Sequence, residues 1–292
     1  MTNGQARQPA GRMLASTARF VWAHPANAGQ RGAAMARFAG WQVWQRVARR
    51  PWTVTMHGRS LRCYPHSTSA VAVLYCRLPE WEDMRFVLDY LRAGDTFVDV
   101  GANVGVYSLL ASAVEGVDVV AFEPSSDNRA RLEENVRLNR LERRLVVIGA
   151  AVGATEGEAA FTTGLDTVNH LLEPGDSTGG GTELVRTMTL DTALSTDVRG
   201  RVSLVKIDVE GAEAQVLGGA EALIAEGSPT FIVERNEVGA LGAFFAAHGY
   251  VTCRYEPLSR RLDACSVTDA TGNNIIAVAD LEQARARLQG QS

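Results

Sequence analysis

Short apolar stretches alternate with amphipathic ones from residue 96 onward, a pattern that is typical of parallel βαβ units. Runs of β-branched and other apolar residues predict strands at 96–100, 117–122, 145–152, 202–207, 230–233, 250–255 and 274–279. Apolar residues at helical spacing predict helices at 104–114, 127–138, 212–225 and 240–247. Residues 158–162 are expected to add an antiparallel neighbour. This order of elements predicts an α/β fold with a doubly wound, mostly parallel sheet of seven strands.

The first 79 residues follow a different pattern. Residues 1–30 are rich in Ala, Gly, Arg and Gln, a composition that predicts a loosely ordered start. A helix is predicted after them at 35–47, followed by a hairpin around His57-Gly58 at 52–64. A second helix is predicted just beyond this part, at 82–91. We therefore expect two parts, a basic N-terminal extension over residues 1–79 and a catalytic domain over residues 80–292.

A polar stretch interrupts the alternation of strands and helices at residues 164–182, and it contains Gly179-Gly180-Gly181. Long polar segments without a periodic pattern inside a compact domain are often functional loops. This stretch is predicted to be a flexible active-site lid or an exposed loop.

Charge is distributed unevenly along the chain, although the net charge is only −4. The first 79 residues hold eleven arginines and no Asp or Glu, whereas the rest of the chain holds 33 acids and 18 bases. Such a split indicates either an anionic partner for the N-terminal part, such as a phosphorylated substrate, a membrane surface or RNA, or a basic arm that docks on its own acidic domain. We favour the second interpretation, because runs of charge are usually solvated surfaces.

The cysteines and the hydropathy of the chain indicate where the protein resides. Cys63, Cys76, Cys253 and Cys265 show no C-x-x-C spacing, so neither a zinc site nor a disulfide framework is predicted. No apolar run approaches the roughly 18 residues that a membrane span needs, and no signal-peptide core follows the arginines near the N-terminus. We expect a soluble, cytoplasmic protein with reduced thiols and no stable membrane insertion.

The turn after the first strand of the predicted sheet carries the pattern Asp99-x-Gly101-x-Asn103-x-Gly105. In open α/β sheets a nucleotide-like ligand lies at this turn, outside the carboxyl ends of the strands. The two glycines would let the backbone approach the ligand, and Asn103 can form a hydrogen bond within the turn. Glu123 ends the second strand, where a carboxylate accepts both ribose hydroxyl protons.

The charge of this turn favours S-adenosylmethionine over a dinucleotide. A pyrophosphate requires a G-x-G-x-x-G turn and a helix N-terminus without nearby anions. Here Asp99 stands two residues before the first glycine. S-adenosylmethionine has no phosphate and carries an ammonium and a sulfonium, for which an acid is favourable. We therefore predict S-adenosylmethionine as the cofactor and expect no NAD binding.

Several segments together resemble the FkbM-type family of S-adenosylmethionine-dependent methyltransferases, over about residues 80–280. They are Phe97-Val-Asp-Val-Gly-Ala-Asn-Val-Gly105, Ala121-Phe-Glu-Pro124, Asn135 to Asn139, Ala151-Val-Gly153, Thr189-Leu-Asp191 and Lys206-Ile-Asp-Val-Glu-Gly211. The resemblance implies a class I, Rossmann-like methyltransferase fold and O-methylation of hydroxyls on sugars or polyketide-derived small molecules. It implies that the cofactor is bound by Asp99, Gly101, Asn103, Gly105 and Glu123, with Asp208 beside the methyl group. One departure is Gly149, where a polar residue near the adenine is expected.

The fourth predicted strand ends in Lys206-Ile-Asp-Val-Glu-Gly211, and the period of two in a strand places Lys206 and Asp208 on the same side. Asp208 should then point into the cleft at the carboxyl end of this strand. Lys206 is the one lysine beside 28 arginines, and its compact ammonium suits a pairing with Asp208 or Glu210. A purely structural lysine is the alternative. Glu213, at the expected helix start, is predicted to stabilise the helix dipole.

Three side chains are candidates for activating an acceptor hydroxyl, namely Asp208, Glu234 and His170. A carboxylate or the imidazole would take the proton of the hydroxyl, and Asp208 is our first choice. No metal ligand is assigned. The alternative is that Asp208, Glu234 and Asn236 hold Mg²⁺, because metal-dependent catechol-type methyltransferases carry acids and an amide at these two strand ends.

The sequence therefore predicts an S-adenosylmethionine-dependent O-methyltransferase that acts on a hydroxyl of a small molecule or sugar, with an anionic acceptor as one option. The alternative is an RNA-binding or nucleic-acid methyltransferase module that uses the basic N-terminal arm. Nucleic-acid amino-methyltransferases carry Asn-Pro-Pro-aromatic where this chain has Asp208-Val-Glu-Gly211, and no aromatic residues on a basic sheet surface are apparent. Nucleic acid is therefore the less favoured partner. The sequence specifies neither the acceptor nor the oligomeric state.

Overall fold

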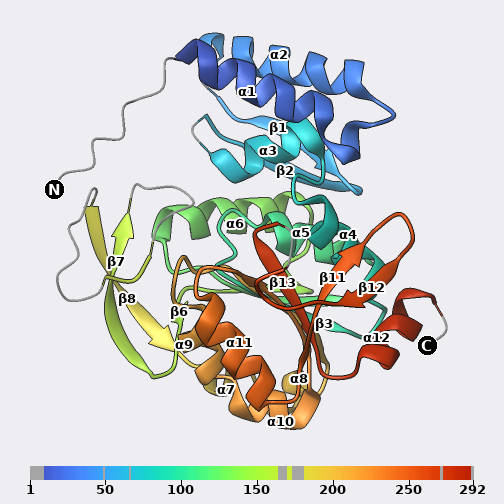
Figure 1. Ribbon diagram of the computed structural model, residues 1–292. Coiled ribbons are helices and arrows are strands. Elements are labelled where there is room, and N and C mark those ends of the chain that lie inside the picture. Colours follow the sequence, from blue (N-terminus) through green and yellow to red (C-terminus); the bar gives the residue numbers. More distant parts are fainter. Residues whose placement is uncertain are drawn as a thin grey trace, which may run out of the picture.

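The computed structural model describes residues 10–48, 50–65, 67–163, 170–172, 181–269 and 272–290. A central sheet of eight strands, in the order β12-β11-β13-β10-β9-β3-β4-β5, runs through the middle of the molecule (Figure 1). Strands β10, β9, β3, β4 and β5 are parallel to one another, whereas β13, β11 and β12 pair in antiparallel fashion. The predicted α/β fold with a doubly wound, mostly parallel sheet is therefore confirmed.

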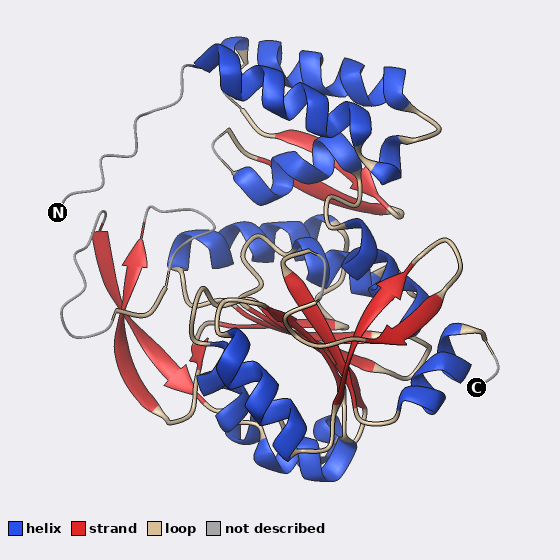
Figure 2. Cartoon of the chain, viewed as in Figure 1, coloured by secondary structure: helices blue, strands red, loops and turns tan. Residues whose placement is uncertain are grey.

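The strands of the central sheet are β3 (Thr96–Val100), β4 (Asp118–Phe122), β5 (Leu145–Ile148), β9 (Val202–Ile207), β10 (Thr230–Glu234), β11 (Val251–Glu256), β12 (Arg261–Ala264) and β13 (Asn274–Val278). Every residue of β3 and β13 is buried, because helices cover both faces of the sheet (Figure 2). The sheet has eight strands rather than the predicted seven, because β12 folds back on β11 as a hairpin.

Helices cover the sheet in two layers (Figure 1). One face carries α4 (Trp81–Tyr90), α5 (Val106–Ser112) and α6 (Ser126–Leu138). The other face carries α7 (Leu190–Ala193), α8 (Thr196–Arg199), α9 (Glu213–Gly218), α10 (Glu221–Gly227) and α11 (Val238–Ala247). The last helix, α12 (Leu281–Leu288), packs beside β12 and α4. In the described ranges, no helix combines the length and the apolar character that crossing a membrane requires.

The strand predicted at 145–152 is interrupted after Ile148. The chain continues in β6 (Ala151–Val152), which pairs with β8 (Gly181–Met188) in a separate sheet. The third strand of this small sheet is β7 (Gly157–Thr163), which contains the antiparallel neighbour predicted at 158–162. That neighbour therefore pairs with β8 and not with the central sheet.

The helix predicted at 212–225 is divided into α9 and α10 around Gly219. A Cβ at this position would lie 2.2 Å from the carbonyl oxygen of Gly153, so only glycine fits here without a steric clash. The carboxylate of Asp191 accepts hydrogen bonds from the backbone N–H groups of Ala222 and Leu223 at 2.8 and 2.9 Å. Asp191 therefore provides acceptors for N–H groups in the first turn of α10. This role explains why the motif at residues 189–191 contains an aspartate.

An N-terminal layer covers α4 to α6 on the side away from the sheet (Figure 1). Its elements are α1 (Ala10–Ala23), the 3-10 helix η1 (Pro25–Asn27), α2 (Arg31–Val47), β1 (Trp52–Met56), β2 (Arg59–Cys63) and α3 (Thr68–Cys76). The prediction of a loosely ordered start is wrong for residues 10–30, because Val21 is fully buried and the Asn27 amide donates to the carbonyls of Val21 and Tyr75. Residues 1–9 lie outside the described residues.

Two asparagines, one in α6 and one at its C-terminal cap, attach the β1–β2 hairpin to the rest of the fold. The side chain of Asn139 accepts from the N–H of Ser60 and donates to its carbonyl, both at 2.7 Å. Asn135 accepts from the N–H of Arg62 at 3.0 Å and donates to the carbonyl of Val104 at 2.9 Å. The two amides therefore pair with β2 as a neighbouring strand would, and Asn135 joins that strand to the turn after β3.

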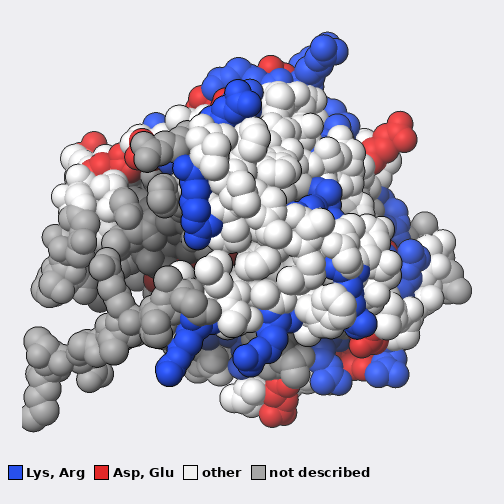
Figure 3. Space-filling view, turned by 90° about the horizontal axis from the view of Figure 1, so that it is seen from above, with Lys and Arg blue, Asp and Glu red and all other residues white. Residues whose placement is uncertain are grey.

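The arginines of the N-terminal layer are spread over its surface, as Figure 3 shows in a view from above, with acids mainly toward the rim. Arg62 pairs with Glu134 of α6 at 2.8 Å. Arg37, Arg59 and Arg77 instead donate to backbone carbonyls. The layer is therefore held mainly by apolar packing and hydrogen bonds to the backbone, more than by pairing of its charges with the acidic part of the chain.

Most of the glycine-rich stretch at 164–182 lies outside the described residues. Gly181 and Thr182 belong to β8, and Leu171 forms an isolated bridge with Phe161 of β7. The expectation that this stretch acts as a lid stays a prediction.

Candidate active site

The turn between β3 and α5 passes very close to neighbouring elements. Gly101 has a φ of 80°, and a Cβ there would lie 1.9 Å from the carbonyl oxygen of Asp208. Gly105 has a φ of 89°, and a Cβ there would lie 2.3 Å from a methyl carbon of Leu132. Asn103 is also left-handed, and its Oδ1 accepts a hydrogen bond at 2.8 Å from the next backbone N–H. Both glycines are therefore required by packing, and Asn103 stabilises the turn.

Glu123 follows β4 and carries a buried carboxylate. Its Oε2 accepts from the N–H of Asn103 at 2.7 Å, and its Oε1 accepts from the N–H of Ser125 at 2.9 Å. Burial raises the pKa of Glu123 to about 7, although both backbone hydrogen bonds act in the opposite direction. Each oxygen keeps a lone pair for a further donor, so the carboxylate can accept two adjacent hydroxyl groups.

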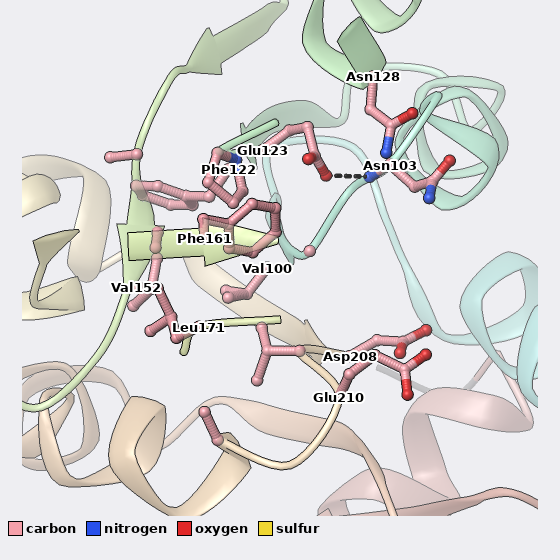
Figure 4. A pocket seen from close by; sticks show the side chains of 16 residues that line it. Val100, Asn103, Phe122, Glu123, Asn128, Val152, Phe161, Leu171, Asp208 and Glu210 are labelled. Carbon is pink, nitrogen blue, oxygen red and sulfur yellow. Dashed lines mark hydrogen bonds between the residues drawn. The ribbon is translucent and has the colours of Figure 1, made fainter. Parts of the chain in front are cut away.

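A first cavity opens at the carboxyl ends of β3, β4 and β9 (Figure 4). Asn103 and Glu123 form one polar edge, and Asp208 and Glu210 form another. Its apolar wall is made by Val100, Phe122, Val152, Phe161 and Leu171. An apolar slot beside a carboxylate suits a flat heteroaromatic ring that is joined to a ribose.

Packing explains Gly149, the position at which a polar residue was expected. A Cβ at residue 149 would lie 2.7 Å from a guanidinium nitrogen of Arg129, which donates to the carbonyl of Pro124 at 3.2 Å. Ala150 and Ala151 line the first cavity, and Gly149 does not. The departure from the family pattern therefore makes room for an arginine of α6.

A second cavity adjoins the first and shares Gly101, Asn103, Asp208 and Glu210 with it. Its charged lining consists of five carboxyl groups and one ammonium, from Glu80, Asp99, Asp208, Glu210, Glu234 and Lys206. Side chains of α3 and α5 complete the wall. The excess of carboxyl groups favours a neutral or cationic ligand over an anionic one.

Lys206 is buried, and its Nζ donates to Oδ2 of Asp208 at 2.6 Å. The ammonium also lies 4.6 Å from the ring centre of Tyr107. Burial alone lowers the pKa of Lys206, but the carboxylates of Asp208, Glu80 and Asp99 outweigh it and raise that pKa. The predicted pairing of Lys206 with Asp208 is confirmed, and the lysine stays charged in the cleft.

Asp208 and Glu234 share a hydrogen bond and hold different charges. Burial alone would raise the pKa of Asp208, but the charge of Lys206 and the hydrogen bonds from Lys206 and Glu234 outweigh it, so this pKa lies below its usual value. Burial and the negative charges of Asp208 and Glu210 raise the pKa of Glu234 to about 8. At neutral pH Glu234 is therefore protonated and donates to an ionised Asp208.

These carboxyl groups do not suit Mg²⁺. Asp208, Glu210 and Glu234 each offer an oxygen within 4.8 Å of the others. However, Asp208 is bonded to the ammonium of Lys206, and protonated Glu234 accepts from the amide of Asn236 at 2.6 Å. Mg²⁺ requires a near-octahedral set of oxygen ligands, usually including ionised carboxylates. The ammonium of Lys206 on Asp208 therefore disfavours the alternative set of Asp208, Glu234 and Asn236 as a site for this ion.

His170 and Glu213 lie at the margin of the site. His170 donates from its backbone N–H to the hydroxyl of Thr162 at 2.8 Å, and it lines neither cavity. Burial and neighbouring acids raise the pKa of Glu210, and the charge of nearby His170 opposes that shift. Glu213 is buried in the first turn of α9, the position from which an acid stabilises the helix dipole, and it also accepts from the N–H of Gly211 at 3.0 Å in the turn after β9.

A hydrogen-bond network at the wall of the second cavity was not predicted from the sequence. The hydroxyl of Tyr107 donates to Oε2 of Glu80 at 2.7 Å, and the amide of Asn274 donates to the same oxygen at 3.1 Å. Asn274 also donates to Asp83 at 2.8 Å, and burial raises the pKa of Asp83 to about 7. These residues come from α5, from α4 and its N-terminal cap, and from β13, which are distant in sequence. The one local signal for this network was Tyr107, because it lies two residues after Gly105 and therefore close to the predicted cofactor turn.

The sequence matches the family model described as the methyltransferase FkbM domain over residues 99–252. The hexuronic acid methyltransferase AglP of Haloferax volcanii is 30% identical over 148 residues, which is 48% of this chain and 56% of that protein. The 31-O-demethyl-FK506 methyltransferase FkbM of Streptomyces tacrolimicus is 32% identical over 205 residues, which is 58% of this chain and 77% of that protein.

Among solved structures, the methyltransferase FkbM from Methylobacillus flagellatus KT matches with a TM-score of 0.45 and 18% identity. This match covers 84% of the present chain and 60% of the solved one. The chain thus spans less than two thirds of AglP and of the solved structure.

Proposed function

The chain belongs to the FkbM family of methyltransferases, and from this membership and the geometry of its cavities we propose that it is an S-adenosylmethionine-dependent O-methyltransferase. The cofactor binds in the first cavity and a hydroxyl-bearing acceptor in the second. One observation carries the proposal, namely that Asp208 lines both cavities and is held ionised by Lys206. Radiolabelled S-adenosylmethionine, incubated with the protein and a panel of hydroxylated compounds, tests it directly.

The residues of the first cavity fit this cofactor. Glu123 accepts the ribose hydroxyls, and Val152, Phe161 and Leu171 contact the adenine. Asp99 lines the second cavity and not the first, and its buried carboxylate accepts from the hydroxyl of Ser108 at 2.6 Å. Its contact with the ammonium of the cofactor stays a prediction. When bound, the cofactor supplies a methyl group that is already activated on a positively charged sulfur.

Cofactor affinity is expected to decrease as the pH falls through about 7, which is the pKa of Glu123. The ionised carboxylate accepts both hydroxyl donors, so binding at lower pH must first expel a proton. We expect about a tenfold loss of affinity for S-adenosylhomocysteine between pH 8 and pH 6, with proton release at the lower pH. Calorimetry in two buffers of different ionisation enthalpy measures both quantities. A constant affinity without proton release would contradict the role of Glu123.

Asp208 is the proposed general base. An aliphatic hydroxyl is a poor nucleophile at neutral pH, so its proton must leave as the oxygen bonds to the methyl carbon. The side chain of Asp208 is 35% exposed to the cleft, and Lys206 and neutral Glu234 orient it. Glu234 is protonated at neutral pH and cannot take this proton, and His170 lines neither cavity. Asp208 is therefore preferred to both as the base.

The acceptor is proposed to be a small molecule or a sugar with an uncharged or cationic reacting end. The names of the two relatives, one a hexuronic acid methyltransferase and one a demethyl-FK506 methyltransferase, support an acceptor of this size. An anionic group on the acceptor would have to point away from the five carboxyl groups of the second cavity. The ionised carboxylates of this cavity would repel the phosphates of a nucleic acid, which weakens the alternative of an RNA-directed module. A cytoplasmic location stays a prediction.

Glu234→Gln is expected to retain at least about one third of the wild-type kcat at pH 7, because the amide still donates to Asp208. Glu234→Ala removes the donor and is expected to lower kcat about tenfold. Initial rates of S-adenosylhomocysteine formation, with an acceptor identified by the screen, measure both effects. A hundredfold loss in Glu234→Gln would instead indicate that Glu234 is the base or a metal ligand.

A further inference from the structure

The N-terminal layer carries a groove that the proposed reaction does not use. The groove lies among α1, α2 and α3, and its apolar wall consists of Met13, Leu14, Phe20, Trp41 and Val71. Met13, Leu14 and Phe20 are 61%, 36% and 47% exposed, which is unusual for side chains of this size. They lie on one side of α1, because residues 13 and 20 are about two helical turns apart. Exposed apolar side chains gathered in a groove indicate a binding surface.

The groove is continuous with the second cavity along one edge of α3. Thr68 and Ala72, which are one turn apart, line both. Thr68 is exposed and Ala72 is half-buried, so among the described residues no bulky side chain on this edge separates the two spaces. The neighbouring Ser69 lines the second cavity, where its Oγ lies 3.4 Å from Oδ1 of Asn103. A ligand lying across this edge would reach Asp208 with one end and α1 with the other.

The polar groups of the groove allow an oxygen-bearing ligand but offer no charge. The amide of Gln42 donates to the hydroxyl of Tyr75 at 3.0 Å, and that of Gln45 donates to Gln42 at 2.9 Å. Ser67 is 1% exposed, and its Oγ has no hydrogen-bond partner among the described residues. A buried hydroxyl without a partner is unfavourable, and an oxygen of the ligand would satisfy it. No carboxyl group of a described residue lines the groove.

We propose that this groove binds the apolar body of the methyl acceptor, which makes the acceptor an amphiphile. Its hydroxyl-bearing, uncharged head lies at Asp208, and its alkyl or alicyclic body lies across Thr68 and Ala72 on the apolar wall of the groove. This inference rests on the function proposed above. The groove belongs to residues 10–79, outside the segment 99–252 that matches the family, so it gives this chain an acceptor preference of its own.

The test measures the binding of methyl, hexyl and octyl β-glucoside, below their micelle concentrations, to the full-length protein saturated with S-adenosylhomocysteine. Each methylene that is buried contributes about fourfold in affinity, so octyl glucoside should bind on the order of 100-fold more tightly than methyl glucoside, or better. Phe20→Glu and Met13→Glu should reduce this gain to less than about tenfold, because a buried charge opposes the alkyl chain. Neither variant should change the affinity for S-adenosylhomocysteine or for methyl glucoside.

Val43→Glu is the matched control. Val43 is 63% exposed on α2, as Met13 is 61% exposed on α1, but it does not line the groove. This variant should keep the full gain with chain length.

Three results would overturn the proposal. They are equal affinities for methyl and octyl glucoside, a gain that survives both groove variants, and a gain that Val43→Glu reduces as strongly as Phe20→Glu. Retention on phosphatidylcholine and phosphatidylglycerol vesicles without binding of monomeric octyl glucoside would assign the face to a membrane surface and overturn it as well. Failure of the wild-type protein to bind S-adenosylhomocysteine would instead contradict the proposed function, so the two failures are distinguishable.

Discussion

Asp208→Asn is expected to lower kcat by about a hundredfold or more, while the affinity for S-adenosylhomocysteine stays within about threefold of the wild type. Asparagine keeps the shape of the side chain, but its amide cannot take the proton of the acceptor hydroxyl. Lys206 loses its closest partner in this variant, but the carboxylates of Glu80 and Asp99 continue to stabilise its charge. Initial rates and calorimetry, measured on the same preparation, separate the loss of chemistry from a loss of binding.

Asp263→Asn is the matched control for this variant. The side chain of Asp263 is 35% exposed, as that of Asp208 is, and it pairs with Arg261 at 2.7 Å. It lies on β12 at the edge of the sheet, away from both cavities. This control should leave kcat unchanged, because an exposed ion pair contributes little.

The pH profile gives a second readout of Asp208. Because the pKa of Asp208 lies below its usual value, kcat should show no loss from protonation of the base between pH 5 and pH 8. Full turnover by Asp208→Asn would reject the carboxylate as base and direct the search to His170.

Glu123→Ala is expected to weaken the binding of S-adenosylmethionine by about 30- to 800-fold. The variant removes a charged acceptor for both ribose hydroxyls. It also leaves the backbone N–H groups of Asn103 and Ser125 without their present acceptor, so the turn after β3 loses a hydrogen bond that stabilises it. Calorimetric titration gives the affinity, and circular dichroism verifies that the variant is folded.

Asp118→Ala provides the comparison, because Asp118 begins the strand that Glu123 follows. Its side chain is 44% exposed and pairs with Arg201 at 3.1 Å, at the end of the strand remote from the first cavity. Cofactor affinity should be unchanged in this variant. An unchanged affinity in folded Glu123→Ala would remove Glu123 from the cofactor site.

The sequence by itself determined the features that lie within one strand and the turn after it. The spacing of Asp99, Gly101, Asn103 and Gly105 specified a turn of left-handed residues, because such a turn depends on local backbone conformation. The period of two along β9 placed Lys206 beside Asp208, and the structure shows that hydrogen bond. The length of β4 placed Glu123 at the carboxyl end of the sheet. Each of these predictions needed only residues that are close together in the chain.

Tertiary structure alone decided how distant elements meet. Nothing local indicates that Asn135 of α6 and Asn139 at its cap would pair with β2, or that Asp191 would cap α10, since these partners are about 30 to 80 residues apart. The charges of the cleft depend on the same kind of contact. The pKa of Glu234 is raised to about 8 because β10 lies beside β9 and brings this side chain against Asp208.

The N-terminal layer shows most clearly that contacts between distant elements could not be predicted from the sequence. Composition predicted a loosely ordered start, because small residues and arginines supply little apolar surface of their own. Residues 10–30 are nevertheless ordered, because Val21 and Asn27 are buried against α3 and its neighbours. The helix α3 itself escaped prediction, since its buried residues do not form a single apolar face. The groove that α3 shares with α1 and α2 exists only once these packed elements are in place.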